Sequence, residues 1–313
     1  MYEDNLICLD QIAHEFEKKY DLSDRYMINF KERLSKWLKN FKTYEEKNAF
    51  LKLLEKYEYF NRIRVRDAFY EMYKQCITNN LEIAETYILS MCKEREADSS
   101  LEYIGLIREM DRIYNLNFYN DTILYDISRI KHKNNVKNIL FFDDICGTGG
   151  TVIKYIQKNE KLLIDKNVYL NFCVLTKCSL DKLNEFKKQY TFIKQINYFK
   201  LKGKSLDDDK ILDENYRKKV ENIENSLWNK GSKNILGYEN SQLLITFFHN
   251  TPNNTISSFW YSKKFYSDQY KNTYGDQEWN SLFERYRPNK RQSNYKKNER
   301  KAKNRAIKAR LYE

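Results

Sequence analysis

The chain has 313 residues, of which 41% are hydrophobic and 15% aromatic, so it can bury a substantial core. No stretch approaches the roughly 20 apolar residues that a membrane-spanning helix needs, and the N-terminal residues lack the apolar segment of a secretory signal. We therefore expect a cytoplasmic protein with no membrane partner.

The net charge of +12 is concentrated at the C-terminal end. Residues 285–313 contain 12 Lys or Arg and two Glu, which leaves 44 basic and 42 acidic side chains in the preceding 284 residues. Such a basic tail either contacts nucleic acid through its phosphates or is a disordered solubilising segment. The sequence favours neither reading.

The six cysteines are scattered and include no C-x-x-C pair. A zinc site needs closely spaced ligand pairs, and the chain has only three histidines to complete one. We expect free thiols and no metal held by Cys or His. Cys146 precedes a predicted helix, where a thiol pKa can fall, but we interpret it as a space-filling residue.

Residues 1–85 are expected to form an all-helical N-terminal region. Apolar residues recur there at spacings of three and four, as in Phe30, Leu34, Trp37 and Leu38, and no Pro or Gly occurs before Gly105. These helices offer a surface for a protein partner, but their sequence indicates no particular chemistry.

From residue 86 the pattern alternates between strands and helices. Apolar runs predict strands at 87–92, 138–142, 168–175, 192–199 and 242–248, and helices are expected from 101, at 149–163 and at 180–189. This alternation is typical of a mostly parallel sheet flanked by helices, an α/β domain that we place at 86–284. Residues 203–234 are charged and interrupt the series, which suggests a helical insertion or flap within it.

Three of the eight glycines fall within Gly147–Gly150, directly after the predicted strand at 138–142. A strand, a glycine-rich turn and a helix N-terminus form an anion site, because free amides and the positive helix end face the ligand. A Walker loop would need Lys and Ser or Thr after the last glycine, and a dinucleotide loop would need glycine where Val152 stands. Neither motif is present.

Two carboxylates, Asp143 and Asp144, stand immediately before this turn. Carboxylates are poor neighbours for a bare phosphate, but they suit a ligand that carries sugar hydroxyls beside its phosphate. A ribose 5-phosphate meets both requirements. The alternative is a capped turn with a purely structural role.

The stretch Asn138–Thr151, NILFFDDICGTGGT, resembles the signature of type I phosphoribosyltransferases. Residues 237–254 followed by Trp260 resemble the phosphoribosyltransferase-like proteins with a C-terminal extension (PRTase-CE), found among bacterial conflict and anti-phage systems. The segment from Asp98 is similar to an earlier loop of that group. The resemblance spans roughly residues 85–265 and leaves the helical start and the basic tail outside.

The resemblance implies a phosphoribosyltransferase-like (Rossmann-like) fold that binds phosphoribosyl pyrophosphate or a nucleotide 5′-phosphate. Asp143 and Asp144 would bind the ribose hydroxyls and serve catalysis, and Mg²⁺ would accompany the pyrophosphate. The remaining implied ligand contacts are Gly147, Thr148, Gly149, Gly150, Thr151, Asn253 and Asn254. Lys93 and Arg95 are the cations that the loop at 93–100 offers, and this loop is equally well explained as a solvated one. From the residues alone, 249–254 is as well explained as an ordinary Asn/Pro turn, and Trp260 as a core residue.

Two departures from the family pattern keep other functions open. The loop at 93–100, where the pyrophosphate would bind, contains no glycine, and no base-recognition segment is evident. If the chain is an enzyme, it makes or breaks a bond at ribose C1′. The alternatives are a catalytically inactive nucleotide sensor and a nucleic-acid-associated subunit of a defence complex, for example beside a reverse transcriptase or nuclease.

Overall fold

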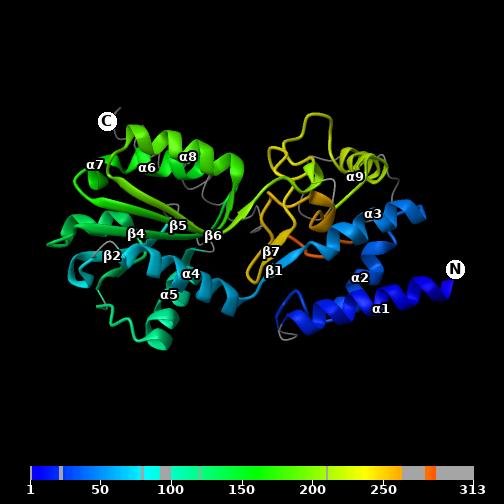
Figure 1. Cartoon of the computed structure of the whole chain (residues 1–313), viewed down its shortest axis with the longest axis horizontal. Coiled ribbons are helices and arrows are strands. Elements are labelled where there is room, and N and C mark those ends of the chain that lie inside the picture. The colour runs from blue at the N-terminus through cyan, green and yellow to red at the C-terminus, as the bar shows by residue number, and fades with distance from the viewer. Residues whose placement is uncertain are drawn as a thin grey trace, which may run out of the picture.

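The computed structural model describes residues 2–20, 24–78, 81–91, 100–119, 121–208, 211–262 and 279–286. They form two lobes joined side by side (Figure 1). The sheet lobe comprises residues 61–202. The mixed lobe combines the chain before residue 61 with the segments 203–262 and 279–286.

The sheet lobe is built on five parallel strands in the order β3-β2-β4-β5-β6. Their bounds are β2 Thr86–Ser90, β3 Ile123–Leu124, β4 Asn138–Cys146, β5 Asn167–Thr176 and β6 Ile193–Lys202. The parallel α/β fold expected from the sequence is confirmed. The strand β3 was missed, and β4 runs four residues further than predicted, through both aspartates.

Both faces of this sheet are covered by helices, which explains why the inner strands β2, β4 and β5 are mostly apolar, whereas the edge strand β6 contains several polar residues. Along β4 the side chains alternate: Leu140 and Phe142 belong to one hydrophobic cluster, and Ile139 and Phe141 to the other. The covering helices are α4 Arg62–Ile77 and α5 Ser100–Tyr114 on the first face, and α6 Gly150–Lys158, α7 Glu160–Leu163 and α8 Lys177–Gln189 on the second. Short 3-10 turns, η1 Ile83–Glu85 and η2 Ile127–His132, complete the lobe.

The strand order reverses between β2 and β4. From β2 the chain passes through α5 to β3 on one side, and then returns to β4 on the other side. At such a switch point the connections leave the sheet in opposite directions, so a crevice opens beyond the carboxyl ends of the two strands. The glycine-rich turn follows β4 at this place.

The mixed lobe contains the N-terminal helices, as expected. It also contains one N-terminal strand that was not predicted, because its residues continue a helical spacing of apolar side chains. Glu58–Phe60 forms β1, so the region 1–85 is helical but not entirely so. β1 pairs in parallel with β7, Ile245–Phe247. The other elements are α1 Tyr2–Lys19, α2 Phe30–Leu38, α3 Tyr44–Glu55, η3 Ser205–Asp207, α9 Glu214–Leu227 and η4 Ser257–Phe259.

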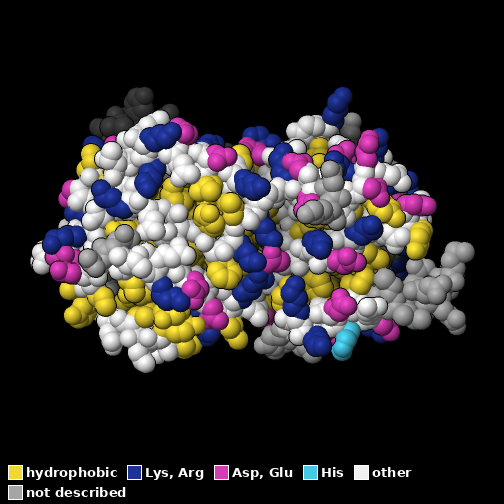
Figure 2. Space-filling view, viewed as in Figure 1, with side chains coloured by type: hydrophobic (Ala, Val, Ile, Leu, Met, Phe, Trp, Pro, Cys, Tyr) yellow, Lys and Arg dark blue, Asp and Glu magenta, His cyan; other side chains and the backbone are white. Residues whose placement is uncertain are grey.

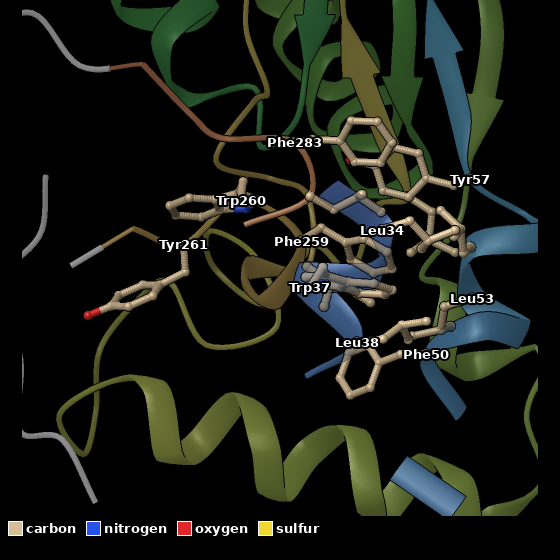
Figure 3. Close-up of a cluster of buried hydrophobic side chains, with 14 of the residues drawn as sticks. Leu34, Trp37, Leu38, Phe50, Leu53, Tyr57, Phe259, Trp260, Tyr261 and Phe283 are labelled. Carbon is tan, nitrogen blue, oxygen red and sulfur yellow. The ribbon is translucent and has the colours of Figure 1, made fainter. Parts of the chain in front are cut away.

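An aromatic core holds N-terminal and C-terminal parts of the mixed lobe together (Figure 3). The ring of Trp37 stacks on Phe259 at 4.9 Å between centroids, and Tyr57 stacks on Phe283 at 4.5 Å. The Trp37 indole also donates to the Ser258 carbonyl at 2.9 Å. Trp260 is fully buried here, as the interpretation of it as a core residue predicted.

Two predicted elements, the strand at 242–248 and the segment 203–234, pack in a different part of the molecule from the one expected. The strand at 242–248 shortens to β7 and pairs with β1, so it does not join the main sheet. Residues 203–234 include helix α9, whose Val220, Ile223 and Leu227 are buried in the core of the mixed lobe. This helix is therefore an integral part of that lobe.

One carboxylate connects the lobes at their junction. Glu58 of β1 accepts hydrogen bonds from Arg64 of α4 and Lys202 of β6, and Lys200 lies 3.8 Å away. Figure 2 shows Lys and Arg side chains gathered between the lobes, over the region where β1 and β6 lie in Figure 1. Glu58 places one negative charge within this basic region.

Candidate functional site

Asp143 and Asp144 lie near the carboxyl end of β4, the central strand of the sheet. Both residues are half-buried. Oδ1 of Asp143 accepts from the Asp144 amide at 3.0 Å, and Oδ1 of Asp144 accepts from the Ile145 amide at 2.7 Å. The backbone thus orients both carboxylates at the switch point.

The turn after β4 leads directly into helix α6. Gly149 adopts φ 74°, a left-handed conformation that glycine reaches without steric cost, and it stands at the N-cap of α6 with no side-chain cap. The first amides of a helix have no intrahelical partner, and they lie at the positive end of its dipole. Thr148 of this turn is half-buried, and Thr151 in the first turn of α6 is exposed. The arrangement suits an anion.

The start of the turn is held from the β5 side by the cap of helix α8. Thr176 and Ser179 form a capping box there. The Thr176 hydroxyl also donates to the Gly147 carbonyl at 2.7 Å, and the Ser179 hydroxyl donates to the Cys146 carbonyl at 2.6 Å. Two carbonyls of the turn are thereby fixed against the sheet.

The mixed lobe holds the turn from the opposite side. A Cβ added to Gly147 would lie 2.2 Å from Nδ2 of Asn254, so only glycine allows this approach. Asn254 is in turn fixed by Gly237, which has φ 81° and whose added Cβ would lie 2.3 Å from the Asn254 carbonyl oxygen. Asn253 is half-buried, and its carbonyl accepts from the Tyr238 amide at 2.6 Å. The structure thus brings Asn254 to the turn, whereas the contact of Asn253 is with the 236–242 segment.

A buried glutamate positions the segment that carries these asparagines. Glu224 of α9 accepts hydrogen bonds from the amides of Leu236, Ser257 and Ser258 and from the Ser257 hydroxyl. Burial raises the pKa of Glu224 above its ordinary value, although these donors act to lower it. The charged segment that seemed to be an insertion therefore holds the chain on both sides of residues 237–254.

His249 and Tyr103 complete the surroundings of Asp144. Nε2 of His249 lies 3.1 Å from Oδ2 of Asp144 and 2.8 Å from the Tyr103 hydroxyl. Burial acts to raise the pKa of Asp144, but the hydrogen bond and charge of His249 outweigh it, with help from Tyr103 and the Ile145 amide. The pKa of Asp144 therefore lies below its ordinary value. The carboxylate is ionised at neutral pH.

Sequence reasoning missed these two residues. His249 follows β7 by two positions and carried a usable signal, since it is one of three histidines and lies within the stretch that resembles the family. Tyr103 lies inside helix α5, where nothing distinguishes it from other buried aromatic residues. Its role depends on a contact that only the fold creates.

Cys76, Cys146, Cys173 and Cys178 form no disulfide bond, as the expectation of free thiols predicted. Cys146 is buried, and burial raises its pKa to about 12, which agrees with the interpretation of this residue as a space-filler. No group of three or more His, Cys, Asp and Glu side chains among the described residues could hold a metal ion. Lys93 and Arg95 lie outside the described residues, so their predicted contacts stay predictions.

Comparison with known proteins agrees with this geometry. The family model of PRTase-CE matches residues 34–285, which includes much of the helical start that we had placed outside the resemblance. A search of the curated proteins gave no match. No helix within the described ranges has the length and apolar character required to cross a membrane. Because the family match spans most of the chain and the parallel sheet carries the glycine-rich turn after its central strand, the chain belongs to the PRTase-CE family, a phosphoribosyltransferase-like group.

Proposed function

We propose that this protein binds phosphoribosyl pyrophosphate, or a nucleotide 5′-phosphate, at the turn between β4 and α6. The amides of Gly147–Thr151 and the Thr148 and Thr151 hydroxyls hold the 5′-phosphate. Asp143 and Asp144 accept hydrogen bonds from the ribose hydroxyls. The observation that carries the proposal is a left-handed glycine turn opening a helix beside two half-buried carboxylates at the switch point of the sheet.

Mg²⁺ fits this proposal as an ion that arrives with the ligand. It keeps several of its waters and is commonly held by substrate phosphates with few protein carboxylates, so it does not need a dedicated protein cage. When bound, it would offset the negative charge of the pyrophosphate. The contribution of the chain is to hold the sugar phosphate and to orient its ribose.

If the protein is an enzyme, the reaction takes place at C1′ of the ribose. A bond forms between C1′ and a nitrogen of the acceptor base, and the bond from C1′ to pyrophosphate breaks, with its electron pair leaving on the pyrophosphate oxygen. Positive charge develops on the ring as this bond breaks. Carboxylates fixed beside the ribose stabilise that charge without reorganising, which is the usual source of electrostatic catalysis.

Calorimetric titration with phosphoribosyl pyrophosphate and Mg²⁺ tests the binding. The wild-type chain should bind, and the double variant Asp143→Asn, Asp144→Asn should lose binding while it remains folded. Asp165→Asn is a matched control, since Asp165 is an exposed carboxylate just before β5, at the opposite edge of the sheet. Undiminished binding by the double variant would refute the assignment.

Catalysis is a separate question from binding. Release of pyrophosphate in the presence of candidate bases would identify a transferase, whereas binding without release would identify a nucleotide sensor. We place either activity in a bacterial defence setting, because the sequence resembles a group found there. A phage plaque assay with wild-type and double-variant genes tests this, and equal plaque counts would oppose it.

A further inference from the structure

The contacts of the Asp144 carboxylate bring three separate parts of the chain together. Asp144 itself belongs to β4, Tyr103 to α5, and His249 to the loop that follows β7 in the mixed lobe. The His249 side chain is only 5% exposed and that of Asp144 15% exposed. The contact is therefore largely shielded from water, where hydrogen bonds to a charged group are strongest.

The geometry fixes the position of the proton between His249 and Asp144. An ionised carboxylate only accepts hydrogen bonds, so the 3.1 Å contact with Oδ2 requires that Nε2 of His249 carries the hydrogen. The Tyr103 hydroxyl then donates to the same carboxylate. Nδ1 of His249 is buried with no hydrogen-bond partner among the described residues, so the polar contacts of this ring are made through Nε2. Nε2 of His249 is therefore the donor in its contact with Asp144.

Aromatic rings enclose the imidazole and prevent it from turning. The centroid of His249 lies 5.8 Å from Phe247, 5.0 Å from Phe248 and 5.3 Å from Tyr103. A ring held in this way keeps its Nε2–H directed at Oδ2. Oδ1 accepts from the Ile145 amide, so each oxygen of Asp144 has at least one fixed donor, and the carboxylate still has acceptor capacity left for a ligand.

We propose that His249 is a positioning residue for Asp144: its Nε2–H fixes the carboxylate so that the remaining lone pairs accept the ligand's ribose hydroxyls. The inference rests on the proposed function, since the sugar supplies those hydroxyls. It assigns the mixed lobe a part in sugar recognition. It also makes the two aspartates unequal, because His249 contacts Asp144.

Substituting His249 by Phe tests the proposal, because Phe keeps an aromatic ring and removes the hydrogen bond. The probes are ribose 5-phosphate and 2-deoxyribose 5-phosphate, which differ by one hydroxyl, and binding is measured by calorimetry. We expect His249→Phe to weaken ribose 5-phosphate by about ten-fold, the usual cost of losing one such partner, and 2-deoxyribose 5-phosphate by a smaller factor, because it offers one hydroxyl fewer to the carboxylates. The exposed His132, changed to Phe, is the matched control.

The outcomes separate the inference from the proposed function. Equal weakening of both sugar phosphates would show that His249 only maintains the fold, and unchanged affinity would show that it does not position Asp144. Either result overturns the inference and leaves the proposed function standing. If the wild-type chain binds neither these sugars nor phosphoribosyl pyrophosphate, the proposed function fails and the inference fails with it.

A spectroscopic signature tests the proton position without any ligand. With three histidines in the chain, the ¹⁵N signals of the imidazoles can be assigned by substitution. Nε2 of His249 should show the shift of a protonated nitrogen at neutral pH, and Asp144→Asn should move it. A bare Nε2, or a signal unaffected by Asp144→Asn, would overturn the inference.

Discussion

Gly147 and Asn254 touch across the two lobes: a Cβ on Gly147 would lie 2.2 Å from Nδ2 and 2.3 Å from Cγ of Asn254. Asn254 also donates to the Ser241 hydroxyl at 3.2 Å and is nearly fully buried. The Asn254 side chain therefore has little space into which it could move away from a Cβ at position 147. The turn that we assign to the phosphate is thus shaped partly by a residue more than a hundred positions away in the sequence.

Replacing Gly147 by Ala should force this contact apart. We expect a loss of about 1–3 kcal/mol in the free energy of unfolding, the usual cost of overpacking, together with weaker binding of phosphoribosyl pyrophosphate. Urea unfolding and calorimetry measure the two effects. Gly105→Ala in α5 is the control, because no heavy atom lies within 4 Å of its added Cβ, and Ala there should stabilise the helix by up to about 1 kcal/mol. Equal stability of the two variants would contradict the contact.

Glu224→Gln should destabilise the mixed lobe. The substitution keeps the size of the side chain but places an NH₂ group opposite donors from Leu236, Ser257 or Ser258. A buried donor without an acceptor costs about 1–3 kcal/mol. The free energy of unfolding, measured by urea unfolding, should fall by about that amount. Glu214→Gln on the same helix removes only an exposed ion pair and should change the stability far less. Similar losses in both variants would argue against the role of Glu224.

Glu58 should make the stability of the protein fall in acid. Burial acts to raise its pKa, but Lys202 and Arg64 outweigh burial and lower it from 4.5 to about 2. The ionised form is thus favoured in the folded state. Its contribution is fully present above pH 4.5 and is lost as the pH falls towards about 2.

Comparison with Glu58→Gln isolates this effect. The difference in unfolding free energy between wild type and variant should be about 1–2 kcal/mol near neutral pH, after allowance for solvent screening, and should shrink below pH 4.5. Urea unfolding across the acid range measures it. A difference that stays constant over that range would show that the ion pairs do not contribute as the geometry indicates.

The first two residues of the basic tail, 285 and 286, are anchored to the mixed lobe. Arg285 donates to the Thr251 carbonyl, and the Tyr286 amide donates to Oδ1 of Asn250 at 2.9 Å. Truncation to 1–284 should therefore lower the melting temperature below that of a chain truncated to 1–286. Thermal unfolding of the two chains decides this, and equal melting temperatures would contradict the anchoring role of residues 285 and 286.

The same truncation tests nucleic-acid binding. We propose that residues 287–313 contact phosphate backbones, so that full-length protein binds nucleic acid at low salt and 1–286 binds less. The difference should disappear steeply as salt is added, because binding releases counterions. Equal affinities at low salt would leave the tail with a solubilising role.

Most of the parallel sheet could be predicted, because apolar residues in the sequence mark β2, β4, β5 and β6. The strand β3 was missed because it is only two residues long. β1 could not, since Glu58–Phe60 is three residues long and continues a helical spacing. The strand near 245 was foreseen, but its partner was not, because hydrophobic pattern gives a strand and does not say which sheet it joins.

The candidate site likewise contains residues that the sequence could identify and residues that it could not. The two aspartates and the glycines are close together in the sequence, so the sequence alone predicted that they form one site. His249 and Tyr103 reach Asp144 from positions 105 and 41 residues away, through a two-lobed arrangement that the sequence does not display. The left-handed segment at 236–242, which fixes Asn254, likewise depends on contacts with α9.

A crystal structure of the full chain with phosphoribosyl pyrophosphate and Mg²⁺ tests the central claim most directly. We predict that the 5′-phosphate lies against the amides of Gly147–Thr151, with the ribose hydroxyls within hydrogen-bond distance of Asp143 and Asp144. A sugar phosphate bound elsewhere on the chain, with this turn unchanged and in contact only with solvent, would contradict it.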